Sequence, residues 1–307
     1  MSAPAVIFIV GFLAATLRVA TPLIYGTLGE LFCERAGILN LGIEGTMFLG
    51  AFVGFAVGFH SGSLWFGVAM AAVGGMVSGL LMSLLAVRFG VNQHVSGLGI
   101  TLLWTGVSLF AFRLVFGESK IQPSVNPFPQ IALFGNLPIL GTIFTQYMLT
   151  YIAILLVPVV WWVINRTSFG LQIRAVGENP EAADAAGLNV YAIRTYALMI
   201  GGALMAVGGA FLSLASVGAF TFGIIAGRGW VCIALIIFAN WRAVSVLWGA
   251  LIFGGVQALQ LRLQTLGFKL PYELFLSLPY LVTILALSIA GRNAMAPSAL
   301  LKPYRRE

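Results

Sequence analysis

Charge is what this sequence has least of. Only 8% of its 307 residues are Asp, Glu, Lys or Arg, against 60% hydrophobic residues and a mean hydropathy of +1.01. A soluble domain carries about a quarter charged residues, so this composition indicates a protein that crosses a membrane several times. Its 37 glycines, set among Leu-, Ala- and Val-rich stretches, are typical of closely packed helices rather than of a β-barrel. We therefore expect an all-α polytopic integral membrane protein, one transmembrane domain over residues 1–307, with roughly eight to ten spans.

Residues that carry catalysis are equally scarce. The chain has two histidines, His60 and His94, and no HExxH pattern, which argues against a zinc hydrolase. Its single aspartate, Asp184, lies in a polar connection where it is poorly placed to complete a Ser-His-Asp triad. The two cysteines, Cys33 and Cys232, lie in or beside apolar stretches, so we expect no disulfide. We predict no catalytic, metal or cofactor-binding residues, and an integral-membrane enzyme would lack a nucleophile–base pair.

Energy-coupling signals are missing too. No GxxxxGK[ST] motif occurs, so the chain has no phosphate-binding loop and no ATPase site of its own. The predicted spans carry neither the closely spaced acids of a proton pump nor the arginine repeat of a voltage sensor. The formal charge of +7 comes from basic residues scattered singly or gathered at loops and the tail, which is explained by membrane topology and does not indicate nucleic acid. What remains is a passive conduit that needs an external motor.

Hydrophobic runs divide the chain into spans. The first 25 residues lack a basic leader and form a spanning helix interrupted by Arg18, so we expect no cleavable signal. GxxxG stripes at Gly50, Gly54 and Gly58, and at Gly75 and Gly79, predict close helix packing rather than chemistry. An apolar run after the glycines around Arg228 is too short for a full span and predicts a re-entrant or discontinuous helix. The remaining spans are expected at about 64–87, 92–116, 146–165, 195–217, 244–263 and 273–290.

Residues 26–55 are too polar for a regular lipid-facing helix. Each charge there would cost about 3 kcal/mol on insertion scales. The segment holds Glu30, Glu34, Asn40 and Glu44 among several glycines. Three interpretations stay open: a cytoplasmic turn, a broken helix that lines a polar cavity, and an ion-paired helix end in which Glu30 and Glu34 meet Arg35 or another arginine.

Two further polar segments frame the spans. Asn92, Gln93 and His94 open the span at 92, either as a substrate-lining cluster or as a polar helix cap at the interface. The connection 117–145 contains four prolines and only two charged residues, so it is expected to be a long irregular loop.

The longest polar interruption runs from residue 166 to 194. Asn179 is a good N-cap, Pro180 fits the first helical position, and Gly187 is a natural terminator, with helix-forming alanines between them. Glu178, Glu181 and Asp184 fall three apart and share roughly one face. The pattern predicts a short acidic-and-alanine helix that either docks into a groove of a soluble partner or is simply a solvated loop.

Counting Lys and Arg in the loops sets the orientation. The 166–194 loop has three and the 291–307 tail has four, whereas the 117–145 connection has one. The positive-inside rule therefore places the loop and the C-terminus in the cytoplasm, with the 117–145 connection outside.

Particular residues resemble a known family. Glu181-Ala182-Ala183, followed after three residues by Gly187, is similar to the EAA-x3-G loop of ABC importer permeases, although the usual I-x-L-P ending is absent. The longer run RAVGENPEAADAAGLNV resembles the sugar, nucleoside and branched-chain amino acid branch of those permeases. ERAGILNLGIEGTMFLGAF, NQHVSGLGITLL and GRGWVCIALIIFANW agree, so the resemblance covers most of residues 26–260 and is nearest to the nucleoside and simple-sugar subgroup.

That resemblance implies a complete machine. It implies a multi-pass permease in the bacterial plasma (inner) membrane, working with an ABC ATPase subunit that binds the ATP, a second permease, which is a different chain in most members, and an extracytoplasmic substrate-binding protein. The coupling residues would be Glu178, Asn179, Pro180, Glu181, Ala182, Ala183, Asp184 and Gly187. The binding protein would deliver substrate near the 60–63 turn, the 117–145 connection and the 264–273 turn.

The translocation path and its cargo are open at this level. Polar and aromatic residues inside or beside the spans are the path candidates: Asn40, Glu44, Asn92, Gln93, His94, Trp104 and Arg228. An uncharged nucleoside would need amide and aromatic partners, which Asn92, Gln93 and Trp104 could supply. We expect a nucleoside importer; the alternatives are the same machine for a simple sugar such as a pentose, and an ion-driven secondary transporter with no ATPase.

Overall fold

The computed structural model describes residues 3–117, 122–132 and 140–265, then 277–278, 281–282, 284–285 and 288 and the segment 295–305. The predicted span at 273–290 and the turn at 264–273 lie largely outside these residues. Within them the chain is mostly helical, with two three-residue strands, which confirms the expected fold class. Seven helices are long and apolar enough to cross a membrane, and the helix after Gly227 is a short apolar one of 11 residues, as its brief hydrophobic run predicts.

The main elements follow in order along the chain. The helices are α1 (Ala3–Arg35), α2 (Ile43–Ser61), α3 (Leu64–Met82), α4 (Gln93–Phe116), α5 (Leu140–Ile143), α6 (Met148–Arg166), α7 (Ser168–Glu178), α8 (Pro180–Ala185), α9 (Val190–Phe211), α10 (Arg228–Phe238) and α11 (Ala243–Thr265). Two π-helical turns, Ser83–Arg88 and Leu212–Ser216, extend α3 and α9, and two strands, β1 (Gln130–Ala132) and β2 (Thr145–Tyr147), form a small antiparallel hairpin.

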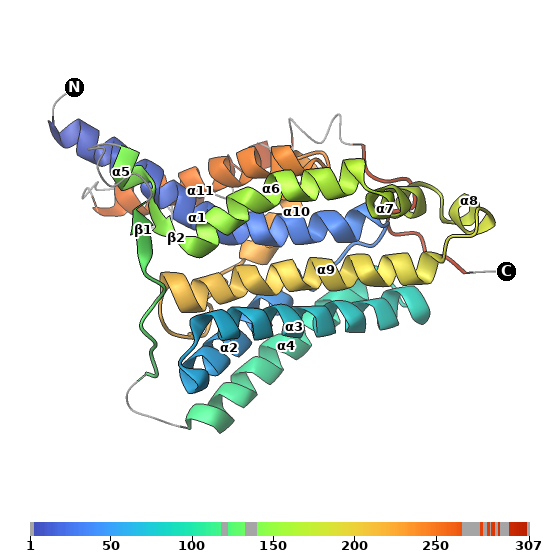
Figure 1. The fold of residues 1–307 in the computed structure, drawn as a ribbon, viewed down its shortest axis with the longest axis horizontal. Helices are drawn as coiled ribbons and strands as arrows, with labels where there is room; N and C mark the ends of the chain where they lie inside the picture. Colours follow the sequence, from blue (N-terminus) through green and yellow to red (C-terminus); the bar gives the residue numbers. More distant parts are fainter. Residues whose placement is uncertain are drawn as a thin grey trace.

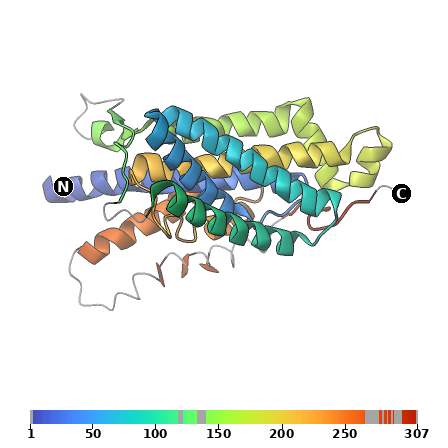
Figure 2. The same cartoon turned by 90° about the horizontal axis from the view of Figure 1, so that it is seen from below.

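The bundle has two distinct ends. Figure 1 shows α1, α3 and α9 running along the long axis, with β1, β2, α5 and the N-terminus at one end and α7, α8 and the C-terminus at the other. The perpendicular view keeps the two termini at opposite ends (Figure 2). The described parts of the 117–145 connection and the acidic helix are therefore at opposite ends of the bundle, as the alternation of basic loops requires.

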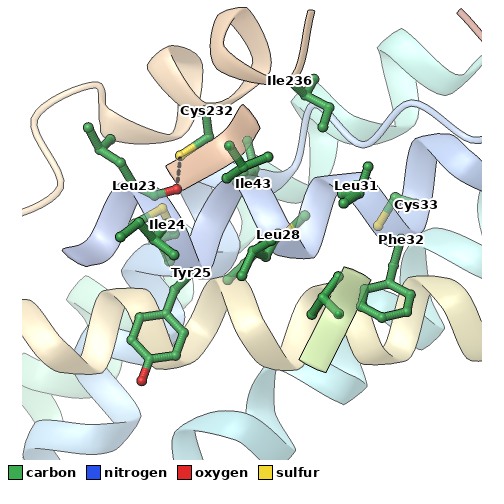
Figure 3. Packing of buried hydrophobic residues seen from close by; sticks show 14 of the residues in the cluster. Leu23, Ile24, Tyr25, Leu28, Leu31, Phe32, Cys33, Ile43, Cys232 and Ile236 are labelled. Atoms are coloured by element: carbon green, nitrogen blue, oxygen red, sulfur yellow. Dashed lines mark hydrogen bonds between the residues drawn. The ribbon is translucent and has the colours of Figure 1, made fainter. Parts of the chain in front are cut away.

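Helix α1 forms the centre of the molecule. It packs against α6, α9, α10 and α11, and its residues Leu23, Ile24, Leu28 and Leu31 are almost completely buried. Figure 3 shows Cys232 of α10 beside Leu23, and its thiol donates to the carbonyl of Leu23 at 3.7 Å. Both cysteines are free and buried, which confirms that they form no disulfide.

Polar partners on the two strands accommodate the charge of Arg18 within the first span. Its guanidinium donates to the side chains of Gln146 (3.2 Å) and Gln130 (3.4 Å), which lie on the two strands of the hairpin. The hairpin itself was not predicted from the proline-rich connection. The hairpin, in which Ile131 lies opposite Gln146, is joined to α1 by Arg18 and by Gln146 Nε2, which donates to Ala14 O at 3.1 Å.

Glycines let the helices approach until their backbones touch. A Cβ on Gly75 would lie 2.1 Å from the carbonyl oxygen of Gly202, and a Cβ on Gly50 would lie 2.1 Å from that of Ala206. Any side chain at these positions would separate α3 or α2 from α9. The prediction that the glycine stripes are packing faces is confirmed, and they make α9 a hub for α2 and α3.

Candidate functional site

The acidic helix α8 has the capped geometry that its sequence predicts. The Asn179 side chain accepts from the backbone N–H of Ala182 at 2.9 Å, and Pro180 occupies the first turn. At the other end Gly187 has a φ of +86°, and Leu188 N donates back to Ala183 O at 3.0 Å. These caps satisfy the free backbone groups of a helix only six residues long, so it can stand out from the bundle as an ordered knob.

The surface of α8 is open on the faces that carry the motif. Glu181, Ala182 and Gly187 are exposed, Asp184 is half-buried, and Ala183 packs into the core of the bundle. Glu178 is the last residue of the preceding helix α7, and its carboxylate accepts from Ser298 Oγ at 2.8 Å and Ser298 N at 3.2 Å. One of the three predicted acids therefore also holds the C-terminal segment against α7.

Two features of this connection were not predicted. The stretch before Asn179 forms a separate helix, α7, which Thr167 caps by accepting from Gly170 N at 3.1 Å. Arg194, counted as a loop cation, is instead buried in α9 and donates to Ala36 O at 3.1 Å. The polar loop therefore ends before residue 194, and it holds fewer basic residues than the three on which the orientation was based.

A second group of polar residues gathers where the chain breaks between α1 and α2. Asn40 is buried in this break; its backbone N–H donates to Glu30 at 2.8 Å, and its side-chain oxygen accepts from Gly42 N at 3.0 Å. Gln93, at the start of α4, accepts from Leu39 N at 2.8 Å. These contacts hold an irregular backbone inside protein, which is the condition for non-helical chain at membrane depth.

Glu44 joins this break to α10. Its two carboxylate oxygens accept from Gly227 N at 2.9 Å and Gly229 N at 2.7 Å, so a negative charge caps the positive end of the short helix. Arg228 lies between those two residues and donates to the carbonyls of Ile224 and Ile225. Its Nε is buried and has no acceptor within the described part of the chain. We call Asn40, Glu44, Gln93 and Arg228 the helix-break site.

The remaining path candidates lie around α4. Asn92 accepts from His94 N at 2.9 Å, so it caps α4 as one of its two interpretations predicts, and both Asn92 and His94 are exposed. Trp104 is half-buried and donates to Ser78 at 2.9 Å, which ties α4 to α3. The structure thus brings Asn40, Gln93, Glu44 and Arg228 together, but it places Asn92 and His94 on the surface.

The expectations for Glu30 and Glu34 need correction. Helix α1 continues to Arg35, so residues 26–35 are neither a cytoplasmic turn nor a broken helix, and the break is confined to 36–42. The donors that the described residues offer these carboxylates are neutral: the Asn40 backbone for Glu30, and the Trp241 indole for Glu34 at 2.5 Å. Arg35 donates instead to the carbonyl of Trp241 at 2.7 Å.

Comparisons with known proteins agree with the motifs. The family described as branched-chain amino acid transport system / permease component matches residues 12–287. The chain is 39% identical to TsgC13 of Haloferax volcanii, provisionally named a glucose ABC transporter permease protein, over 98% of this chain and 99% of that one. It is 36% identical to the guanosine ABC transporter permease protein NupQ of Bacillus subtilis, over 94% and 95% of the two chains.

A second guanosine ABC transporter permease protein of the same Bacillus subtilis strain, NupP, is 26% identical over 80% of this chain and 72% of that one. No solved structure matches the chain significantly. The match over residues 12–287 and the full-length identities to NupQ and TsgC13 leave one conclusion: this chain belongs to the family of permease components typified by branched-chain amino acid transport systems.

Proposed function

We propose that this chain is the membrane-spanning permease of an ABC importer that moves a nucleoside. The observation that carries the proposal is α8: an exposed, doubly capped, acidic-and-alanine helix at the end of the bundle opposite the hairpin. A knob of this kind fits a groove on a soluble partner. Relatives named for ABC transport of guanosine and of glucose support the assignment and leave a simple sugar as the alternative cargo.

A movement of α8 has a direct route to the helix-break site. Helix α7 touches the end of α1 so closely that a Cβ on Gly177 would lie 2.0 Å from Arg35 O. The chain then enters the break, where Glu30 binds the backbone of Asn40. ATP-driven closure of the partner would push α8, and the push would pass through α7 to the end of α1 and to the break, opening the path by rigid-body motion.

The chemistry of the helix-break site suits an uncharged polar ligand. The carboxylate of Glu44 is balanced by the α10 N-terminus, so it offers no free charge to a cation. The Nε of Arg228 is buried without an acceptor among the described residues, and opening of the path would make it a donor for a hydroxyl or carbonyl oxygen of the cargo. Nucleosides and sugars both present such oxygens without a net charge, and the site does not separate them.

The proposed assembly needs three kinds of partner. An ABC ATPase would take α8, and an extracytoplasmic binding protein would dock at the opposite end, around the turn between α2 and α3 and the segment 122–132. A second permease would complete the path between two bundles. Two guanosine permease proteins in one organism, both similar to this chain, support a pair of different permeases.

The test is co-purification followed by activity. We expect a Walker-A ATPase to purify with the full chain, and ATP hydrolysis in liposomes to rise with nucleoside-loaded binding protein. Glu181→Lys should abolish that stimulation because it reverses the charge on the exposed face of α8, and Gly187→Pro should do so because proline cannot adopt a φ of +86°. Ala185→Ser, a neutral change at an exposed position of α8 outside the coupling residues, is the matched control.

Two outcomes would redirect the proposal. If sugar-loaded binding protein stimulates ATP hydrolysis and nucleoside-loaded binding protein does not, the chain is still an ABC importer permease, but its cargo is a sugar. Uptake by the purified chain alone, driven by an ion gradient and normal in Glu181→Lys, would replace it with a secondary transporter.

A further inference from the structure

A cleft opens between α3 and α9 at the end of the bundle that carries α8. Its cavity of about 580 Å³ is lined by Arg88, Asn189, Tyr191, Thr195 and Tyr196, among others. Arg88 closes the π-helical turn at the end of one span, and Asn189 immediately precedes the next. This polar space, the headgroup cleft, is therefore at the level where the spans leave the membrane.

The headgroup cleft continues directly into an apolar groove. A second cavity of about 480 Å³ shares Ser83, Arg88 and Thr195 with the first and is otherwise lined by Val77, Leu80, Leu81 and Leu84. Val77, Leu80 and Leu84 are 50%, 49% and 43% exposed, an outward apolar stripe at helical spacing on α3. We call this second space the acyl groove. Polar and apolar sections thus meet at Arg88.

The boundary between the two sections is built from α3 and α9 together. Thr195 donates to Tyr191 O at 2.7 Å and lies 2.6 Å from the Ser83 hydroxyl. With the Thr195 proton committed to Tyr191 O, Ser83 is the donor in that pair. The Ser83–Thr195 pair lines both cavities and joins the end of α3 to α9 there.

Charge at the headgroup cleft has one sign. Arg88 is the charged residue among the described residues that line it. The C-terminal segment adds a second cation, since the guanidinium of Arg305 comes within 3.7 Å of the Cβ position of Gly90, and Tyr304 packs on Tyr191 with ring centroids 5.7 Å apart. Basic pockets between spans at the membrane surface bind acidic lipid headgroups.

We propose that this surface binds one anionic phospholipid, with its phosphate between Arg88 and Arg305 and an acyl chain in the acyl groove. A soluble phosphate compound would use the polar section but leave the adjoining groove empty. A protein partner would need a matching apolar ridge ending in an acid. The continuous change from apolar to cationic along α3 matches the lipid. The site is independent of which substrate the transporter carries.

Native mass spectrometry of the full chain, delipidated and then titrated with phosphatidylglycerol or phosphatidylcholine, tests the proposal. Wild type should retain phosphatidylglycerol at concentrations at least severalfold lower than phosphatidylcholine. Arg88→Gln should weaken phosphatidylglycerol binding by about fivefold, the effect of one basic residue at a membrane surface, and weaken phosphatidylcholine binding less, because choline offsets the phosphate charge of that lipid. Arg88→Lys should keep most of the preference for phosphatidylglycerol over phosphatidylcholine.

Two variants separate the sections of the site. Leu84→Asn should weaken the binding of both lipids because it removes apolar contact from the acyl groove. Position 84 is exposed enough for the fold to tolerate the change. Arg113 is an exposed arginine at the far end of α4, and Arg113→Gln should leave the binding of both lipids unchanged. Equal retention of the two lipids by wild type, or equal losses in Arg88→Gln and Arg113→Gln, would overturn the proposal. So would cross-linking of Leu84→Cys to a partner protein in the assembled transporter.

Discussion

Glu34 shows how a charged residue can belong inside a membrane helix. It is 1% exposed, and Glu30, one turn earlier on α1, is 0% exposed. One oxygen of Glu34 accepts from the Trp241 indole, and its other oxygen and one of Glu30 have no donor in the described part of the chain. Trp241 also lies at the end of α10 with a φ of +52°, an unusual backbone for a bulky residue. Glu34 therefore helps to hold a strained turn in place.

Two substitutions of Glu34 separate the contribution of its hydrogen bond to stability from the contribution of its side-chain volume. Glu34→Gln keeps an oxygen for Trp241 and puts an N–H₂ group in place of its unpaired oxygen, where it can donate to Glu30, so we expect stability at or slightly above wild type. Glu34→Leu leaves the indole N–H buried without an acceptor and should cost about 1–3 kcal/mol. Thermal unfolding of the full chain in detergent, followed by size-exclusion fluorescence, measures both. Equal destabilisation by the two variants would show that the indole contact contributes nothing.

At the scale of elements, the neighbouring glycines Gly74 and Gly75 make a matched pair on α3. The backbones of Gly75 and Gly202 approach each other reciprocally, with hypothetical Cβ distances of 2.1 and 2.2 Å to the opposite carbonyl oxygens. At Gly74 the nearest atom would be a flexible valine side chain at 3.7 Å, an ordinary contact.

We expect Gly75→Ala to destabilise the fold by about 1–3 kcal/mol, because it must push α3 away from α9. Gly74→Ala should be neutral or stabilising by up to about 1 kcal/mol, because alanine is the better helix former. The same thermal assay compares them directly. If Gly74→Ala were the more harmful change, α3 would have to face α9 with its other side in the folded protein.

The elements also show what sequence can and cannot predict. The caps of α8 and the glycine packing faces were predictable because each depends on neighbours within a few residues or on a simple repeat. The continuation of α1 through Glu30 and Glu34 was not, because Trp241 and the break residue Asn40 come from other parts of the fold. For the same reason the partners of Glu44, the backbone N–H groups of Gly227 and Gly229, could not be predicted from the sequence.

At the scale of the whole molecule, the two ends of the bundle carry different segments of the chain. The segment 122–132 packs on the end of α9, through Val125 N to Gly218 O at 2.8 Å and Phe128 N to Leu214 O at 3.0 Å. At the opposite end the segment 295–305 packs on α7, through Ala299 N to Gly177 O at 2.9 Å. Helix α8 and the C-terminal segment therefore lie at the same end of the bundle, and the positive-inside rule predicts that this end faces the cytoplasm.

Labelling in intact cells tests this orientation for the molecule as a whole. The native Cys33 and Cys232 are buried, so they give a low background with a membrane-impermeant maleimide. Ser124→Cys, an exposed position near the hairpin, should react in intact cells, whereas Ala182→Cys on α8 should react only after the membrane is permeabilised. The reverse pattern would invert the bundle. It would also remove α8 from the compartment that holds ATP, and with it the physical basis for an external ATPase as the motor.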